Sequence, residues 1–219
     1  MIYILLIILA IFIWWFYSNK ISIKLRTFVK RGFRPSRTNF GLYCFCGKQG
    51  SGKTYSIIEY LHHNKDKTIF CNIKGIQGIE YIYFEDFDWI LKNVDKFNNC
   101  IIVYDEIFTL LEKNKSLKKE FMGFISQMRK REIIFLTSAQ EWLEINMTLR
   151  RYCRFFIGCK ILPLFGSGIL IKGFHDAENM TYDKDLSDYV APLISTSISK
   201  VNKYIADSYD TRQVIETSK

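Results

Sequence analysis

The sequence predicts an α/β fold in which a mainly parallel sheet is flanked by helices. Two observations carry this prediction. Beyond Pro35, short β-rich apolar runs alternate with stretches of helical periodicity, which is typical of layered α/β proteins. A glycine-rich loop also separates the first apolar run from the first helical stretch. The length of 219 residues leaves room for one domain of ordinary size and a smaller segment.

The elements are expected in a definite order. Strands are predicted over residues 39–46, 67–72, 100–104, 133–138 and 153–160, and helices over 54–62 and 116–131. In the longer helix, one face carries Leu117, Phe121, Phe124, Ile125 and Met128. The pattern weakens from about residue 166, where we expect a strand over 168–174, irregular structure over 175–199 and a short closing helix over 200–208.

The positive charge is confined to one part of the chain. There are 31 Lys and Arg residues against 22 Asp and Glu, which gives a net charge of +9. Residues 1–58 carry nine basic side chains and no acidic one, because the first carboxylate is Glu59. Residues 59–219 are therefore formally neutral, and overall charge is no argument that they bind nucleic acid. An aromatic content of 16 % with only three prolines excludes a mainly disordered chain.

An uninterrupted apolar run over residues 2–17 predicts a transmembrane anchor over 1–18. At about 1.5 Å per residue the run spans most of the hydrocarbon core of a bilayer, although it is short for a span. No basic residue precedes the run and it ends on aromatic side chains, which disfavours a cleaved signal peptide. The charge behind the run places the N-terminus outside and residues 20–219 in the cytoplasm. The alternative is a buried core helix.

A basic linker is predicted over residues 19–38, ahead of an α/β domain over 39–219 whose end, from about residue 166, is irregular. The linker carries Lys20, Lys24, Arg26, Lys30, Arg31, Arg34 and Arg37. The favoured interpretation is that these side chains set the membrane topology and contact anionic lipid, at about 1 kcal/mol each. The alternative is a collar that contacts DNA.

Six cysteines are scattered without a C-x-x-C pair, and only three histidines accompany them. Metal-ligand spacing is therefore missing from the sequence. Reduced core thiols in a cytoplasmic domain are the expectation.

The glycine-rich loop matches the phosphate-loop pattern G-x-x-x-x-G-K-[ST]. Its residues are Gly47, Lys48, Gln49, Gly50, Ser51, Gly52, Lys53 and Thr54. Glycines let backbone N–H groups turn towards phosphate oxygens, and the N-terminus of the following helix adds positive charge. Lys53 is expected to reach the β- and γ-phosphates, and Thr54 to offer its hydroxyl to Mg²⁺. The pattern predicts a P-loop nucleoside triphosphatase with ATP and Mg²⁺ as cofactors.

Two further polar strand ends are expected beside this loop. Asp105 ends an apolar strand and is the expected outer-sphere Mg²⁺ ligand, while Glu106 is expected to polarise an attacking water. This acidic pair favours a hydrolase over a simple nucleotide binder. Gln140 ends the fourth strand, so that it is expected beside the γ-phosphate. The alternative for Gln140 is an ordinary turn residue.

Two basic clusters flank the fourth strand. We expect one arginine of the second cluster to neutralise the charge that develops during hydrolysis at the site of a neighbouring subunit. The candidates are Arg150, Arg151 and Arg154, and Arg151 is the one we select. The cluster 129–131 is a candidate contact to DNA phosphates in a ring channel. Both clusters also fit solvated ends of helices.

The order GKQGSGKT, IIVYDE, MRKRE, IIFLTSAQ and LRRYCRFFIG resembles the FtsK–HerA group of DNA-pumping ATPases over residues 39–160. Within that group the chain is similar to the Zot-like ATPases of filamentous-phage assembly and to phage DNA-packaging ATPases. The resemblance implies a RecA/FtsK-like fold and an ATPase site formed by Lys53, Thr54, Asp105, Glu106 and Gln140. It also implies a ring homo-oligomer with DNA and with phage coat or other virion assembly proteins as partners.

Zot-like proteins place the ATPase before their membrane span, whereas the apolar run comes first here. The resulting hypothesis is a membrane-anchored ATPase that translocates phage DNA during virion assembly, by extrusion or by packaging. Two alternatives stay open: a small-molecule or nucleoside kinase that uses the same loop, and a membrane scaffold gated by nucleotide without turnover. A GTPase is disfavoured because no N-K-x-D motif occurs.

Overall fold

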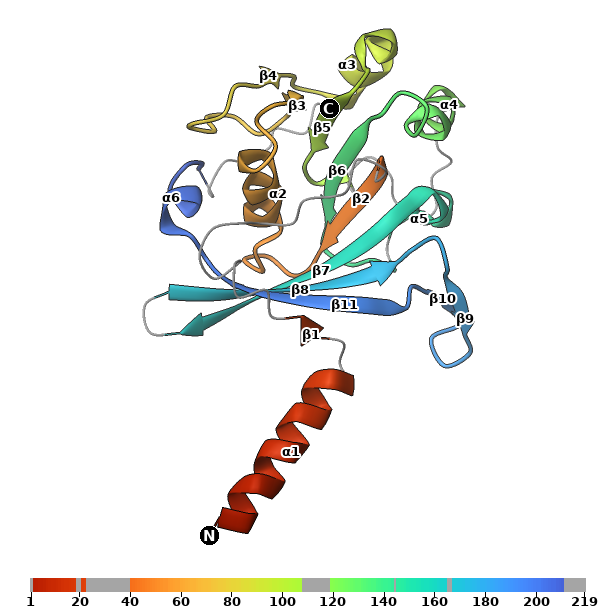
Figure 1. Cartoon of the computed structure of the whole chain (residues 1–219). Helices are drawn as coiled ribbons and strands as arrows, with labels where there is room; N and C mark the ends of the chain where they lie inside the picture. The colour runs from red at the N-terminus through yellow and green to blue at the C-terminus, as the bar shows by residue number, and fades with distance from the viewer. Residues whose placement is uncertain are drawn as a thin grey trace.

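A nine-stranded sheet forms the centre of the protein in the computed structural model, which describes residues 2–18, 21–22, 40–107, 119–143, 145–164 and 167–210 (Figure 1). The order of its strands is β1-β11-β8-β7-β2-β6-β5-β3-β4. The parallel strands are β2 (Gly41–Cys46), β3 (Thr68–Cys71), β4 (Ile82–Tyr83), β5 (Cys100–Tyr104), β6 (Ile134–Ala139) and β7 (Cys153–Leu164). The predicted α/β fold with a mainly parallel sheet flanked by helices is confirmed.

Helices cover both faces of the parallel strands and enclose a hydrophobic core on each. One core lies under α2 (Lys53–His62) and α6 (Lys203–Ala206). The other lies under α3 (Phe87–Lys92), α4 (Lys119–Gln127) and α5 (Met147–Tyr152), with the short 3₁₀ helix Val94–Lys96 between α3 and β5. Central strands such as β5 are buried throughout, as expected where both faces of a sheet are covered. All six cysteines are buried as free thiols.

An antiparallel extension follows the parallel strands, and here the predicted irregular structure over 175–199 was wrong. β7 turns back into β8 (Ser167–Asp176), which pairs with β11 (Leu193–Lys200). A separate hairpin joins β9 (Thr181–Asp183) and β10 (Asp188–Val190). The sequence of β11, LISTSISK, lacks a strong apolar run because most of this strand is only partly buried. Its strand conformation depends on pairing with β8, which is distant in sequence.

Element boundaries differ from the predictions in other places as well. The helix predicted over 116–131 is observed as α4, and residues 116–118 lie outside the described residues. The closing helix is shorter than predicted. The sequence did not predict the short helices α3 and α5, which begin at the N-caps Asp86 and Asn146. In each, the cap side chain accepts a backbone N–H bond, and this satisfies one of the free donors at a helix start.

The N-terminal helix α1 (Ile2–Ser18) extends away from the sheet edge in Figure 1. The short strand β1 (Ile21–Ser22) comes next among the described residues and pairs in parallel with β11. Within the described part of the chain, no helix is both long enough and apolar enough to cross a membrane. The predicted transmembrane span over 1–18 is therefore not found among these residues, since α1 has 17 residues, at the lower limit of the usual length of a span. The basic residues of the predicted linker lie outside the described residues.

Arg150 attaches the β9–β10 hairpin to the parallel part of the sheet. Its side chain is 1 % exposed and donates to both carboxylate oxygens of Asp188, at 2.9 and 3.1 Å. It also donates to the carbonyl oxygen of Tyr189. Removing one partner of a buried ion pair leaves the other charge uncompensated.

We therefore expect Arg150→Ala to lower the free energy of unfolding by about 3 kcal/mol in a urea titration. Arg151→Ala is the matched control, because the neighbouring Arg151 side chain is exposed, and we expect it to leave stability nearly unchanged. Equal, small losses in the two variants would show that the buried pair contributes little.

Candidate functional site

The phosphate loop connects β2 to α2, and its conformation requires glycine at two positions. Gly52 is the N-cap of α2 with φ of 89°, in the left-handed region. Gly47 has φ of 150°, and a Cβ there would lie 2.6 Å from the carbonyl oxygen of Cys159. The amide of Gly47 donates to the carbonyl oxygens of Ala139 and Gln140, at 3.3 and 3.1 Å. The start of the loop is thereby attached to the end of β6.

Lys53 directs its ammonium group into this loop. Nζ donates to the carbonyl oxygen of Gly47 at 2.8 Å and to that of Lys48 at 3.2 Å. The positive charge of the side chain thus joins the backbone N–H groups at the start of α2. This arrangement can bind the negative charge of phosphate groups.

Thr54 joins the loop to the carboxylate at the end of β5. Its hydroxyl Oγ1 donates to Asp105 Oδ2 at 2.9 Å, across 51 residues of sequence. The Asp105 residue is only 6 % exposed. A hydroxyl beside a buried carboxylate fits Mg²⁺, because this ion prefers oxygen ligands and is commonly held by one or two carboxylates. These are the residues that could hold the metal.

Two buried side chains that the sequence did not single out as site residues orient Asp105. Asn72, at the end of β3, accepts a hydrogen bond from the Asp105 amide at 2.8 Å. Ser138, on β6, donates its hydroxyl to Asp105 Oδ1. Asn72 is 5 % exposed and Ser138 is fully buried. The only sequence signal for them is a polar residue at the end of an apolar strand, which many strands share.

Glu106 follows directly and has an unusual backbone conformation. Its φ is 59°, which is uncommon for a residue other than glycine. Its amide donates to Ser138 Oγ at 3.0 Å, so the hydroxyl that contacts Asp105 also holds the backbone of Glu106. Strained conformations of this kind cluster at functional sites. Burial raises the pKa of the Glu106 carboxyl above its ordinary value, the Asp105 charge adds to the rise, and Lys53 opposes it.

The raised pKa predicts the pH dependence of any reaction in which the Glu106 carboxylate acts on water. We expect the rate of ATP hydrolysis to fall with decreasing pH through a pKa above 4.5, the ordinary value for a glutamate. A raised pKa means that the folded protein binds this proton more tightly than the unfolded chain. The stabilising contribution is therefore present at low pH and is lost as pH rises through the folded-state pKa.

Glu106→Gln should accordingly raise the free energy of unfolding at pH 8 relative to the wild type, with a smaller difference at pH 5. Glu85→Gln, at an exposed carboxylate, is the control and should change neither profile. A wild-type rate that stays constant down to pH 4.5 would contradict the prediction.

Gln140 lies at the rim of a cavity beside the phosphate loop. The cavity has a volume of about 330 Å³, and its lining includes Gly47, Gln140, Trp142 and Phe156. Trp142 and Phe156 stack with their ring centroids 5.0 Å apart. The exposed Gln140 side chain and Gly47, the first residue of the loop, therefore line the same cavity.

The arginine candidates lie at the opposite end of the sheet. β7 runs parallel to β2, with Cys153 beside Leu42 and Gly158 beside Cys46, so Arg151 and Arg154 are near the start of the strands, far from the loop. Arg150 is already paired with Asp188. The structure thus does not bring these arginines to the phosphate loop of their own chain. Any role there requires a second subunit.

The cluster 129–131 precedes β6 and lies at that same end. Arg129 Nη2 pairs with Glu178 Oε1 at 3.1 Å, and both side chains are largely exposed. Arg131 donates to the carbonyl oxygen of Val94 at 2.7 Å. Lys130 is exposed.

Comparisons with known proteins agree with this geometry. A family model described as "ATPase family associated with various cellular activities (AAA)" matches residues 43–161. The comparison with curated proteins found no match.

Solved structures similar to the chain include the N-terminal domain of zonular occludens toxin from Neisseria meningitidis. It has 18 % identity and a TM-score of 0.52, over 78 % of this chain and 100 % of that one. Another similar structure is the genome packaging NTPase B204 from Sulfolobus turreted icosahedral virus 2 in complex with AMPPCP. It has 11 % sequence identity and a TM-score of 0.47, and the match covers 72 % of this chain and 98 % of that one. The likeness to the toxin domain confirms the predicted resemblance at the level of the fold.

Proposed function

The chain belongs to the ATPase family associated with various cellular activities (AAA), and from this premise we propose that it hydrolyses ATP with Mg²⁺ to move DNA during virion assembly. The observation that carries the proposal is the 2.9 Å hydrogen bond between Thr54 and Asp105. This bond brings the phosphate loop and the acidic pair into one site. Nucleotide binding alone does not require a second carboxylate, that of Glu106, next to the Thr54–Asp105 contact, whereas hydrolysis requires a group that activates water.

Each residue of the site has a proposed role. The loop N–H groups and Lys53 bind the β- and γ-phosphates. Thr54 and Asp105 hold Mg²⁺, which neutralises phosphate charge when bound. Glu106 orients the attacking water and accepts its proton, which ordinarily contributes a factor of about 10² to 10⁴ in rate. Gln140 orients the same water or responds to loss of the γ-phosphate.

We further propose that the active form is a ring of identical subunits. Arg151 is exposed and lies at the opposite end of the sheet from its own phosphate loop. In a head-to-tail ring this end of one subunit faces the loop of the next, so that Arg151 can neutralise charge on the phosphates there. Arg129 and Lys130 are then candidate contacts to DNA phosphates.

DNA as the substrate is supported by the motif order, which resembles that of DNA-pumping ATPases. Phage coat or other virion assembly proteins are the corresponding protein partners. The test is ATP hydrolysis by the full chain with and without single- or double-stranded DNA. Stimulation by DNA supports the proposal, whereas phosphate transferred to an acceptor instead of water indicates a kinase. Tight ATP binding without turnover indicates a nucleotide-gated scaffold.

Attachment to a membrane through α1, with the ATPase domain on the cytoplasmic side, is also proposed. The apolar side chains of α1 are largely exposed, with Tyr3 at 81 % and Trp14 at 71 %. A helix that is apolar on all sides is stable when it is buried, and lipid can bury it. In flotation with phosphatidylethanolamine and phosphatidylglycerol vesicles, the wild type should float. The variant with Ile8→Glu and Phe12→Glu should not float, while Leu186→Glu, at an exposed residue elsewhere, should behave as the wild type.

A further inference from the structure

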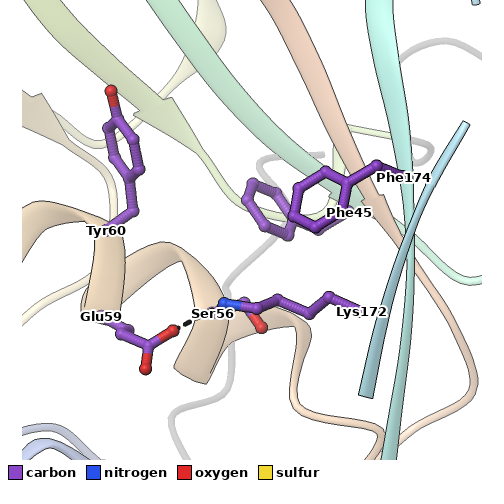
Figure 2. A pocket seen from close by; sticks show the side chains of 6 residues that line it. All are labelled: Phe45, Ser56, Glu59, Tyr60, Lys172 and Phe174. Carbon is purple, nitrogen blue, oxygen red and sulfur yellow. Dashed lines mark hydrogen bonds and ion pairs between the residues drawn. The ribbon is translucent and has the colours of Figure 1, made fainter. Parts of the chain in front are cut away.

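A buried ion pair connects the phosphate-loop helix α2 to the antiparallel part of the sheet. Lys172 Nζ, on β8, donates to Glu59 Oε2, on α2, at 2.7 Å. The two side chains are only 5 % and 8 % exposed. Figure 2 shows the pair beside Phe45 and Phe174, at a cavity of about 10 Å³, which is close to the volume that one water requires. The pair is therefore enclosed by protein and has no free access to solvent.

The same face of α2 contacts the β7–β8 hairpin along its length. At the start of the helix, a Cβ on Gly52 would lie 2.7 Å from Ile161 and 3.0 Å from Leu170. One turn later, Ser56 Oγ lies 3.7 Å from Cys159 Sγ. Residues 52, 56 and 59 share one helical face, and Glu59 is the last of them. The hairpin thus supports the helix from the phosphate loop to the ion pair.

A gain in stability does not by itself explain why an ion pair is buried at this position. Burying two charges costs several kcal/mol for each ion, and well-packed apolar residues of similar volume are often as stable or more stable. The neighbours of Lys172 on the same side of β8, Leu170 and Phe174, are buried apolar residues that make such contacts. What an apolar contact lacks is direction, because hydrophobic association does not depend on orientation. An N–H···O bond of 2.7 Å restricts both the rotation of α2 and its position along the strand.

We propose that Glu59 and Lys172 are positioning residues that hold α2, and with it Lys53 and Thr54, in register with the β7–β8 hairpin. The inference rests on the proposed ATP hydrolysis. β8 pairs with β11, and β11 pairs with β1 next to α1. The ion pair is therefore one of the contacts, beside that of Leu170 with Gly52, through which a displacement of the sheet edge near α1 would reach the phosphate loop.

Four variants of the full chain test the proposal, with melting temperature, Kd for Mg·ATP, KM and kcat measured for each. They are Lys172→Met, the apolar pair Glu59→Leu with Lys172→Met, the exchanged pair Glu59→Lys with Lys172→Glu, and the control Lys200→Met. The control makes the same chemical change at an exposed residue of the adjacent strand β11. Lys172→Met should lower the melting temperature, because Glu59 is left buried without its partner.

The apolar pair decides the question. We expect its melting temperature to equal or exceed that of the wild type, while kcat falls roughly ten- to a hundredfold through misplacement of Lys53 and Thr54. Its Kd for Mg·ATP should rise about tenfold, and the exchanged pair should recover part of both losses. An apolar pair with wild-type Kd and kcat would show that the ion pair is only structural. Should the wild type bind ATP without hydrolysing it, the proposed function fails, and the Kd values of the apolar pair and control still test the positioning role.

Discussion

Lys53→Ala is expected to reduce ATP hydrolysis by at least about a hundredfold. The Lys53 ammonium lies 2.8 Å from the carbonyl oxygen of Gly47, inside the loop that the phosphates must enter. Alanine removes this charge from the position where negative charge develops on the leaving phosphates. Because Lys53 is expected to contact the nucleotide before and during the reaction, the Kd for Mg·ATP should also rise. A phosphate-release assay and calorimetric titration measure the two effects.

Lys96→Ala provides the control for Lys53, since Lys96 is an exposed lysine in the 3₁₀ helix before β5. It should retain wild-type hydrolysis and affinity. The melting temperature of Lys53→Ala should stay close to that of the wild type, because the hydrogen bonds of Lys53 are made to loop carbonyls that water can solvate. Hydrolysis in Lys53→Ala equal to that of the control would place the ATPase site elsewhere.

Glu106→Gln is expected to bind Mg·ATP with an affinity close to that of the wild type while hydrolysis falls about 10²- to 10⁴-fold. Glutamine keeps the size of the side chain but cannot accept a proton from water. The left-handed backbone at Glu106 and its bond to Ser138 involve main-chain atoms, so the substitution leaves them in place. Single-turnover hydrolysis and nucleotide titration together distinguish lost chemistry from lost binding.

The exposed carboxylate of Glu120, at the start of α4, supplies the matched comparison. Glu120→Gln should hydrolyse ATP as the wild type does. If Glu106→Gln also turned over at the wild-type rate, another residue would have to activate the water.

The parts of the fold that follow from local sequence were predictable. The strand over residues 41–46, the loop after it and the helix that begins at Lys53 need only apolar periodicity, glycine and a helix start within a few residues of one another. The position of Asp105 follows in the same way, because the carboxyl ends of neighbouring parallel strands meet at one edge of the sheet. The antiparallel strands β8 and β11 were harder to predict, since β11 has little apolar pattern of its own.

By itself, the sequence determined the α/β fold, the phosphate loop and the residue types that can bind a nucleotide, because each is encoded by patterns a few residues long. Only the tertiary structure decided which side chains meet. Ser138 and Asn72 converge on Asp105 from two other strands. Arg150 is buried and paired with Asp188, so it is not available to contact the nucleotide of a neighbouring subunit. Lys172 lies against Glu59 across 113 residues. Such contacts depend on strand register and helix packing over the whole chain, and no local pattern specifies them.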